Sequence, residues 1–243
     1  MRLLLILTLL WNSFAAFQSA CDKSNVCPAS SATNPASVQW ASNSTTSGTA
    51  STVAVTVSAV GSGHGLFVFC ISISSACTTP TAAGETFLTA TGTSGCQNYA
   101  GDDTQCWYTT NTVGGETSVS CNTGANSNIF CVVGEFTRPS GLSTPKDAGG
   151  NTETASGTST TVSTSAATTN PNDFVIACFG SYGAGNNAIS ISGYTSPSGS
   201  IITNATAQAG CGYVVTSSTG TYSATGSYTS SMRCTGIIMA FKP

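Results

Sequence analysis

One strand pattern occurs twice along this chain, about 105 to 109 residues apart, and this repeat limits the possible folds more than any other feature of the sequence. Residues 47–70 align with residues 156–178 when one deletion is allowed. In each segment a Ser/Thr-rich stretch leads through a turn to an apolar run that ends in a cysteine, Cys70 or Cys178. Similarity at a fixed period is the signature of a repeated structural unit.

The later parts of the two segments match as well. Cys106 lies 30 residues before Phe136, and Cys211 lies 30 residues before Phe241. Each of these cysteines is followed by a tyrosine two residues later, and both halves close on a short Phe-containing strand and a proline. Several coincidences in one register indicate that the chain contains a duplicated unit, and neither half is expected to stand alone.

The repeated segments have the patterns of β-strands. Residues 52–57 alternate between valine and small residues, which is typical of a strand with one buried face, and residues 66–71 are apolar on both faces, which is typical of a central strand. No window has apolar residues at helical spacing. The sequence therefore predicts an all-β, disulfide-stapled, two-sheet antiparallel β-sandwich, jelly-roll-like, with about ten to twelve strands from the two pseudo-repeated halves.

The start of the chain has a different organisation. An arginine, a short apolar run and small residues predict a signal peptide over residues 1–20, because the apolar run is too short to span a bilayer. A Ser/Thr/Ala-rich arm is expected over residues 21–50, before a single sandwich domain over 51–243. The pseudo-repeats are expected at about 51–139 and 156–243.

The chain has 11 cysteines, a number that fits disulfides in an oxidising, extracellular compartment. No two of them have the two-residue spacing that zinc sites favour, so no metal is expected. The odd count leaves one thiol over, with Cys21 or Cys27 as the candidate. Greek-key returns favour two bridges, Cys70–Cys131 and Cys178–Cys234, and a third bridge, Cys96–Cys106, would close the short hairpin loop 97–105. Pairing of Cys106 with Cys131 and of Cys211 with Cys234 remains the alternative.

Charged residues make up only 6% of the chain, and the formal net charge is −3. This balance excludes the basic patch that nucleic-acid binding needs. The single histidine, His64, lies in a glycine-rich turn without a recognisable acidic partner or serine nucleophile, so we expect a solvated loop histidine, no catalytic residue and no cofactor.

Three carboxylates lie on or beside predicted strands, namely Glu85, Glu116 and Glu135. By alternation Glu135 shares a face with Ile129, Cys131 and Val133, and such a half-buried carboxylate would have a raised pKa. A pair of such acids could serve a glycosidase. An ion pair between Glu135 and nearby Arg138 is the structural alternative.

Two neighbouring aromatic residues, Trp107 and Tyr108, are the candidate ligand-binding residues, because exposed aromatic rings can stack on sugars. Aromatic residues on sandwich strands are more often part of the core. Asp102 and Asp103 could donate oxygens to calcium, although a solvated hairpin tip is the better interpretation.

Three motifs carry a resemblance to a known group of proteins. They are the Gly-x-Gly-x-Gly-Leu-Phe-Val run at 61–68, the Asn-Asp-Phe-Val-Ile run at 172–176 and the terminal strand at 237–243. From about Val38 onward the chain resembles an uncharacterised, secreted bacterial β-sandwich (jelly-roll-like) domain family that ends in an Ala-Phe-Lys-Pro strand. The resemblance implies an extracellular, non-catalytic module and assigns no functional residue.

These observations together predict a non-enzymatic extracellular structural or adhesive protein. We expect self-association into a surface filament or layer, through sandwich packing and through donation of a strand from residues 28–50 to a neighbouring copy. A carbohydrate-binding module that binds polysaccharide through Trp107 and Tyr108 is the alternative, and a glycoside hydrolase is third. Neither nucleic acid nor a membrane span is expected.

Overall fold

The computed structural model describes residues 34–46, 48–90, 103–138, 146–182 and 189–243, which belong to one compact unit from Asn34 to Pro243. The described residues form thirteen strands, all paired antiparallel, and no helix. They contain no helix that is long and apolar enough to cross a membrane. The predicted all-β antiparallel sandwich is therefore confirmed, with more strands than the ten to twelve expected. A jelly-roll-like connectivity stays a prediction.

The first half of the unit, which we call the first tier, is a single sheet folded over on itself. One layer of this sheet has the strand order β1-β7-β3-β6-β5 and contains the second part of the long strand β7. The first part of β7 pairs with β2 and β4 in the other layer. The strands are β1 (Ser37–Ser44), β2 (Ala50–Thr56), β3 (Gly65–Ile73), β4 (Cys77–Thr81), β5 (Leu88–Thr89), β6 (Asp103–Thr109) and β7 (Ser118–Phe136).

The second half, the second tier, has the same plan. Strand β13 takes the place of β7, β9 that of β3 and β12 that of β6, while the long strand β8 pairs along β13 as β1 and β2 together pair along β7. The two halves therefore share one topology. The strands are β8 (Lys146–Thr168), β9 (Phe174–Tyr182), β10 (Ser190–Ser192), β11 (Ile201–Thr203), β12 (Ala207–Val215) and β13 (Gly220–Phe241).

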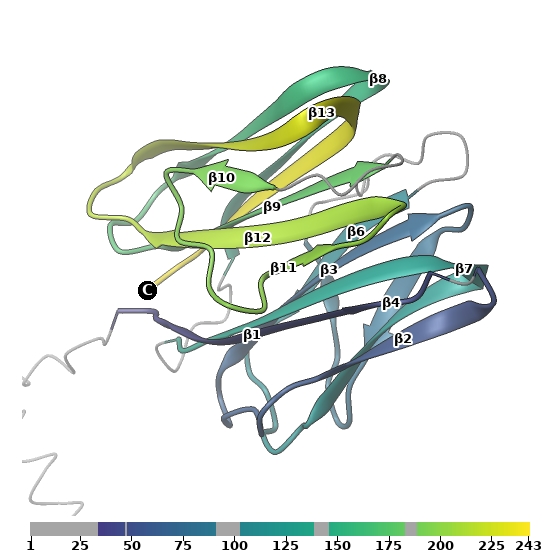
Figure 1. The fold of residues 1–243 in the computed structure, drawn as a ribbon. Helices are drawn as coiled ribbons and strands as arrows, with labels where there is room; N and C mark the ends of the chain where they lie inside the picture. Colours follow the sequence, from purple (N-terminus) through teal and green to yellow (C-terminus); the bar gives the residue numbers. More distant parts are fainter. Residues whose placement is uncertain (1–33, 47, 91–102, 139–145, 183–188) are drawn as a thin grey trace, which may run out of the picture. The chain divides into compact units, whose positions relative to one another are not determined.

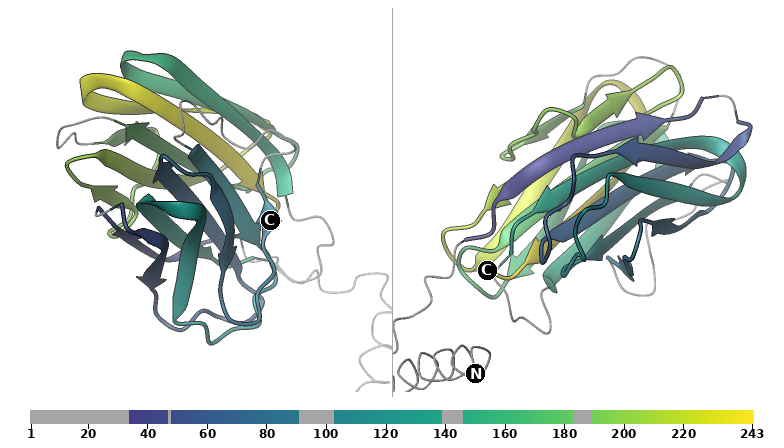
Figure 2. Two further views of the ribbon diagram at one scale, coloured as in Figure 1. Left: turned by 90° about the vertical axis from the view of Figure 1, so that its right-hand side faces the viewer. Right: turned by 90° about the horizontal axis from the view of Figure 1, so that it is seen from below.

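The two tiers stack into four layers with three hydrophobic cores between them (Figure 1). Alternation along β3 sends Phe67 and Phe69 into the central core between the tiers and Val68 into the outer core of the first tier. Along β9, Ile176 points into the central core and Val175 into the outer core of the second tier. Figure 2 shows the same layers from two further sides.

Aromatic side chains join the tiers at one end of the central core. Phe136, the last residue of β7, stacks on Phe174, the first of β9, with ring centroids 5.0 Å apart, and it also meets Phe241 at 4.8 Å. Toward the other end, the Tyr182 hydroxyl of the second tier donates to the Asp103 carbonyl of the first at 2.8 Å. Strands β3 and β9 therefore begin at the same end of the unit.

The structure corrects the alignment of the two halves by one residue. In the first tier Gly65 lies opposite Phe136, and in the second Phe174 lies opposite Phe241. With Phe136 and Phe241 equivalent, Cys70 corresponds to Phe179, and Cys178 does not correspond to Cys70. Because side chains alternate along a strand, this shift of one residue moves Cys178 from the outer core to the central core.

The structure also extends the domain beyond the expected start at residue 51. Residues 37–44 of the predicted arm form β1 and pair with β7 of the same chain. Trp40 is buried in the central core, and its ring lies so close to Gly134 that a β-carbon there would be 2.7 Å from it. The Ser- and Asn-rich sequence of β1 hid this strand, because Trp40 is its one fully apolar buried side chain. Residues 21–33 lie outside the described residues.

Candidate functional sites

Three disulfides form among the described residues, and their pairing differs from the predicted one. The bridges are Cys70–Cys77, Cys121–Cys131 and Cys178–Cys211. The predictions of Cys70–Cys131 and Cys178–Cys234, and the alternatives Cys106–Cys131 and Cys211–Cys234, are therefore wrong. Cys106 is buried in the central core, while Cys96 lies outside the described residues, so the Cys96–Cys106 bridge stays a prediction.

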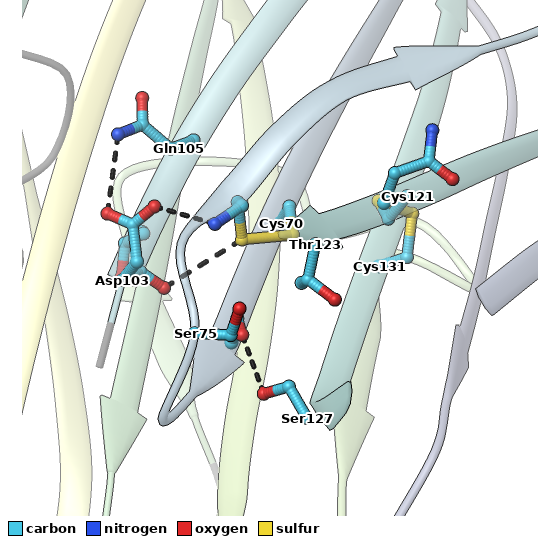
Figure 3. The surroundings of a disulfide bond; sticks show 12 residues. Cys70, Ser75, Asp103, Gln105, Cys121, Thr123, Ser127 and Cys131 are labelled. Atoms are coloured by element: carbon cyan, nitrogen blue, oxygen red, sulfur yellow. Dashed lines mark hydrogen bonds between the residues drawn. A yellow bond between two sulfur atoms is a disulfide. The ribbon is translucent and has the colours of Figure 1, made fainter. Parts of the chain in front are cut away.

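The folded-over sheet of the first tier explains the pairing. Cys70 and Cys131 do lie opposite each other on β3 and β7, but both point into the outer core toward the second layer. There Cys70 bonds to Cys77 of β4, and Cys131 bonds to Cys121 in the first part of β7. Both bridges therefore connect the two layers rather than neighbouring strands (Figure 3). The prediction paired Cys70 with Cys131 because the opening and closing strands lie side by side, and it did not consider bridges to the second layer.

The second tier fills the equivalent space without cysteine. Gly226 and Gly236 stand where the first tier has Cys121 and Cys131, and Phe179 stands where it has Cys70. A β-carbon on Gly226 or Gly236 would lie 2.5 Å or 2.7 Å from the Phe179 ring. The ring therefore occupies the space between layers that disulfides occupy in the first tier.

The candidate ligand-binding aromatics are both buried. Trp107 is 5% exposed and packs in the outer core of the first tier, and Tyr108 is 7% exposed and packs in the central core. The Tyr108 ring meets the edge of Phe241 at 5.3 Å, and burial raises the pKa of its phenol. Neither ring is available as a platform for a sugar, which corrects the prediction for these two residues.

Charged groups gather at one end of the unit. Among the ionisable Asp, Glu, Lys, Arg and His side chains that the structure describes, all except Asp103 lie where β3 and β9 begin and β7 and β13 end. They are His64, Glu85, Glu116, Glu135, Arg138, Lys146, Asp147, Asp173 and Lys242. We call this region the charged end.

Glu135 and His64 form a hydrogen-bonded pair at the charged end. Glu135 is 2% exposed, and its Oε1 accepts bonds from His64 Nδ1 at 2.6 Å and from the Gly61 amide at 2.8 Å, while its Oε2 accepts from Gln39 Nε2 at 2.5 Å. The sequence placed Glu135 correctly on the face of Val133, but its partner is His64 rather than Arg138.

An imidazole oriented by a buried carboxylate is the arrangement that hydrolases use to activate a nucleophile. In the described part of the chain, however, the His64 ring bonds to Glu135, and no serine, threonine or cysteine side chain bonds to the ring. The ring lies flat against Gly61, where a β-carbon would be 2.4 Å from it. The pair closes the end of the outer core, with the Gln39 amide holding Glu135 and also donating to the Ser58 carbonyl.

A second carboxylate pair, Glu85 and Glu116, holds the neighbouring loop. Glu85 accepts a bond from the Val113 amide at 2.7 Å, and Glu116 accepts one from the Gly114 amide at 3.2 Å. Burial raises the pKa of Glu85, with a further contribution from Glu116 beside it. These carboxylates order the loop between β6 and β7.

The equivalent end of the second tier contains the pair Asp147 and Asp173. Asp173 is fully buried, and neither of its carboxylate oxygens has a hydrogen-bond donor among the described residues. Burial, together with the neighbouring Asp147 carboxylate, raises the pKa of Asp173 to about 8. Burial alone would raise the pKa of Asp147 too, but the neighbouring Asp173, bonds from Thr169 and the charge of Lys242 lower it. At neutral pH Asp173 is therefore protonated beside an ionised Asp147.

The candidate calcium ligand Asp103 has an internal role. It is 2% exposed at the start of β6, and its Oδ2 accepts from the Cys77 amide at 2.8 Å (Figure 3). Its Oδ1 accepts from Gln105 Nε2 at 3.3 Å, and burial raises its pKa. Asp102 lies outside the described residues. Among the described residues, no group of three or more His, Cys, Asp and Glu side chains could hold a metal ion.

The outermost layer of the second tier has an uncharged face of hydroxyl groups. Alternate residues of β8, β13 and β10 point outward, and paired positions place them in rows, such as Ser192, Thr225 and Ser163 across three strands. The Thr225 and Ser163 hydroxyls bond to each other at 2.7 Å. The second-tier face consists of Thr161, Ser163, Ser165, Ser190, Ser192, Thr221, Ser223, Thr225 and Ser227.

The outermost layer of the first tier has a similar face on β2, β7 and β4. Asn122 lies between Thr52 and Thr78, and its amide oxygen accepts from the Thr52 hydroxyl at 3.1 Å. This first-tier face consists of Thr52, Ala54, Thr56, Thr78, Thr81, Ser118, Ser120 and Asn122. The two faces lie on opposite sides of the four layers (Figure 1).

Comparison with known proteins finds no match: no family model, no curated protein and no solved structure resembles the chain closely enough to be significant. The resemblance to the secreted bacterial sandwich family therefore stays a prediction.

Sequence reasoning named Glu135 and His64 separately and missed that they meet. It also missed Asp173 and the two hydroxyl faces. With the corrected alignment of the halves, Asp173 is equivalent to His64, because each lies one residue before its strand, β9 or β3. That alignment would have indicated Asp173 as a candidate residue. The faces had a sequence signal in the alternating serines and threonines of residues 161–165 and 221–227.

Proposed function

We propose that the chain is a non-enzymatic extracellular structural protein, a subunit that assembles with its own kind into a surface filament or layer. The separation of charge on the unit carries the proposal. Among the described side chains, all charged groups except the buried Asp103 lie at one end, and several of them bond to partners within the chain, so the two outer faces as described carry no charge. Surfaces without charge pack against each other without electrostatic repulsion.

The covalent construction supports the same proposal. Three disulfides among the described residues and the lack there of a membrane-spanning helix are compatible with an extracellular location. A subunit of an extracellular assembly has to keep its shape without cellular chaperones, and bridges between layers restrict its unfolding.

Donation of residues 37–44 to a neighbour is not part of this proposal, because those residues already pair with β7 of their own chain. Deletion of residues 28–50 would remove β1 and Trp40 from the core, so it would test folding rather than assembly. Packing of whole sandwiches is the route that the described surface supports.

Electron microscopy of the purified mature protein, with its disulfides intact, tests the proposal. We expect regular fibres or sheets that appear above a threshold concentration. Particles that stay dispersed as single subunits at all concentrations, while binding a polysaccharide in a sedimentation assay, would contradict self-assembly and favour a binding module.

A further inference from the structure

We propose that the second-tier face of one copy stacks on the first-tier face of the next, so that copies join in an open row. This inference rests on the proposed function and names the partner: a second copy of the same chain. Its basis is the chemistry and geometry of the two faces.

The first argument is the repeat of polar groups on each face. Neighbouring strands of a sheet lie about 4.8 Å apart, and outward-pointing residues along a strand are about 6.8 Å apart. The hydroxyls of the second-tier face have these two spacings across the three strands β10, β13 and β8. For example, Ser190 and Ser192 of β10 lie opposite Ser227 and Thr225 of β13. On the first-tier face, Thr78 and Thr81 of β4 occupy the corresponding places beside β7.

The second argument concerns the cost of burying hydroxyls. A hydroxyl group taken out of water without a hydrogen bond costs about 1–3 kcal/mol, so a partner must supply donors and acceptors at matching positions. Another sheet face with small polar side chains repeats donors and acceptors at the same two spacings. The other tier of the same chain presents such a face, which includes the Asn122 amide and the Thr52 hydroxyl.

Charge gives the third argument. Neither face carries a charged side chain among the described residues, so stacking them buries no ionised group. The ionisable groups of the charged end lie where strands β7 and β13 end, away from the centres of both faces. A nucleic acid or another charged partner would find no counter-charge on either face.

The position of the faces decides the form of the assembly. They belong to the two outermost layers, on opposite sides of one unit. When two different surfaces on opposite sides of a subunit bind each other, growth does not close on itself and gives an open filament. Contact between identical faces would instead give closed pairs.

Paired lysine substitutions at equivalent positions of the two halves test this arrangement. Ser163→Lys with Ser223→Lys places two charges on the second-tier face, and Ala54→Lys with Ser118→Lys places them on the first-tier face. All four residues are exposed. The control is Ser198→Lys with Ser217→Lys, which adds the same charge at exposed loop positions outside both faces.

Analytical ultracentrifugation of each variant alone and of mixtures gives the readout. We expect wild type and control to assemble, and each face variant alone to associate at least about 100-fold more weakly, because two ammonium groups lose water without a partner. An equimolar mixture of the two face variants should form dimers and stop there, because each variant retains the face that the other has lost. Circular dichroism checks that all variants keep the β fold.

Two results would overturn the inference. If both face variants assemble like wild type, assembly uses other surfaces, and the proposed function stands without this inference. If each variant alone forms dimers, identical faces pair, and the open row is wrong. A wild-type chain that stays monomeric under all conditions would contradict both the inference and the proposed function.

Discussion

Replacement of Asp173 by asparagine should stabilise the protein at neutral pH, although it removes an acidic residue from a buried pair. Asp173 is fully buried beside Asp147, and its pKa is raised from the ordinary value of 3.8 to about 8. In the unfolded chain the same carboxyl is ionised above about pH 4. Folding at neutral pH therefore has to add a proton to Asp173, and the free energy of unfolding falls as the pH rises from about 4 to 8.

The size of the effect follows from these two pKa values. Each unit of pKa corresponds to about 1.4 kcal/mol, so at pH 7 the proton uptake lowers the free energy of unfolding by up to about 4 kcal/mol. Asparagine has the shape of the protonated acid and is uncharged without taking up a proton. Asp173→Asn should therefore match wild type near pH 4 and exceed it by up to about 4 kcal/mol at pH 7, which is about 8–16 °C in Tm.

Thermal and urea unfolding of both proteins between pH 4 and pH 9, with the disulfides intact, measures this difference. Asp147→Asn is the matched control, because the pKa of Asp147 is lowered and its ionised form is the one that the fold stabilises. That variant should lose stability at neutral pH, opposite in sign to Asp173→Asn. Parallel pH profiles for wild type and Asp173→Asn would refute the reasoning, because they would mean that Asp173 takes up no proton on folding.

Three further predictions concern the cores and the polar network. Phe179→Ala should lower the free energy of unfolding by about 3–5 kcal/mol in a denaturant titration, because it empties the space between Gly226 and Gly236, and an unchanged midpoint would contradict the close contact described above. Joint replacement of Cys121 and Cys131 by serine should lower the free energy of unfolding by about 2–4 kcal/mol. Non-reducing peptide mapping of wild type should recover Cys70 linked to Cys77, and a Cys70–Cys131 peptide would disprove the pairing between layers. Glu135→Leu should lower the free energy of unfolding by about 3 kcal/mol or more in thermal unfolding, because the Gly61 amide, the Gln39 amide and the His64 ring lose their acceptor. Glu135→Gln retains an acceptor and should lower the free energy of unfolding less.

Much of the fold could be predicted because its signals are local or periodic. Valine alternation over residues 52–57 predicted β2, and the apolar run over 66–71 predicted the central strand β3. The repeat predicted two similar halves, which the matching pairing of β3 with β7 and of β9 with β13 confirms. These signals depend only on which residues must be buried, and burial leaves its pattern in the sequence.

The prediction was wrong where a feature depends on how a long strand crosses from one layer to the other. Pairing of β7 shifts register between Ala50 and Thr52, and from there the strand belongs to a different layer. The Gly- and Asn-rich residues 122–128 mark a break between two strands but do not show which layer each strand joins, so the partners of Cys70 and Cys131 could not be found from spacing. For the same reason the contact between His64 and Glu135, 71 residues apart, was missed: it needs the register of β3 on β7.

The contrast between Phe179 and the Cys121–Cys131 bridge has a consequence for how the two halves reach their final packing. At the positions equivalent to Cys70, Cys121 and Cys131, the second tier has Phe179, Gly226 and Gly236, whose packing involves no oxidation. The outer core of the first tier contains two bridges, so its final form depends on the oxidation of four thiols. Equivalent places in the two halves are thus filled in one by the shape of a ring and in the other by bonds that respond to the redox state of the surroundings.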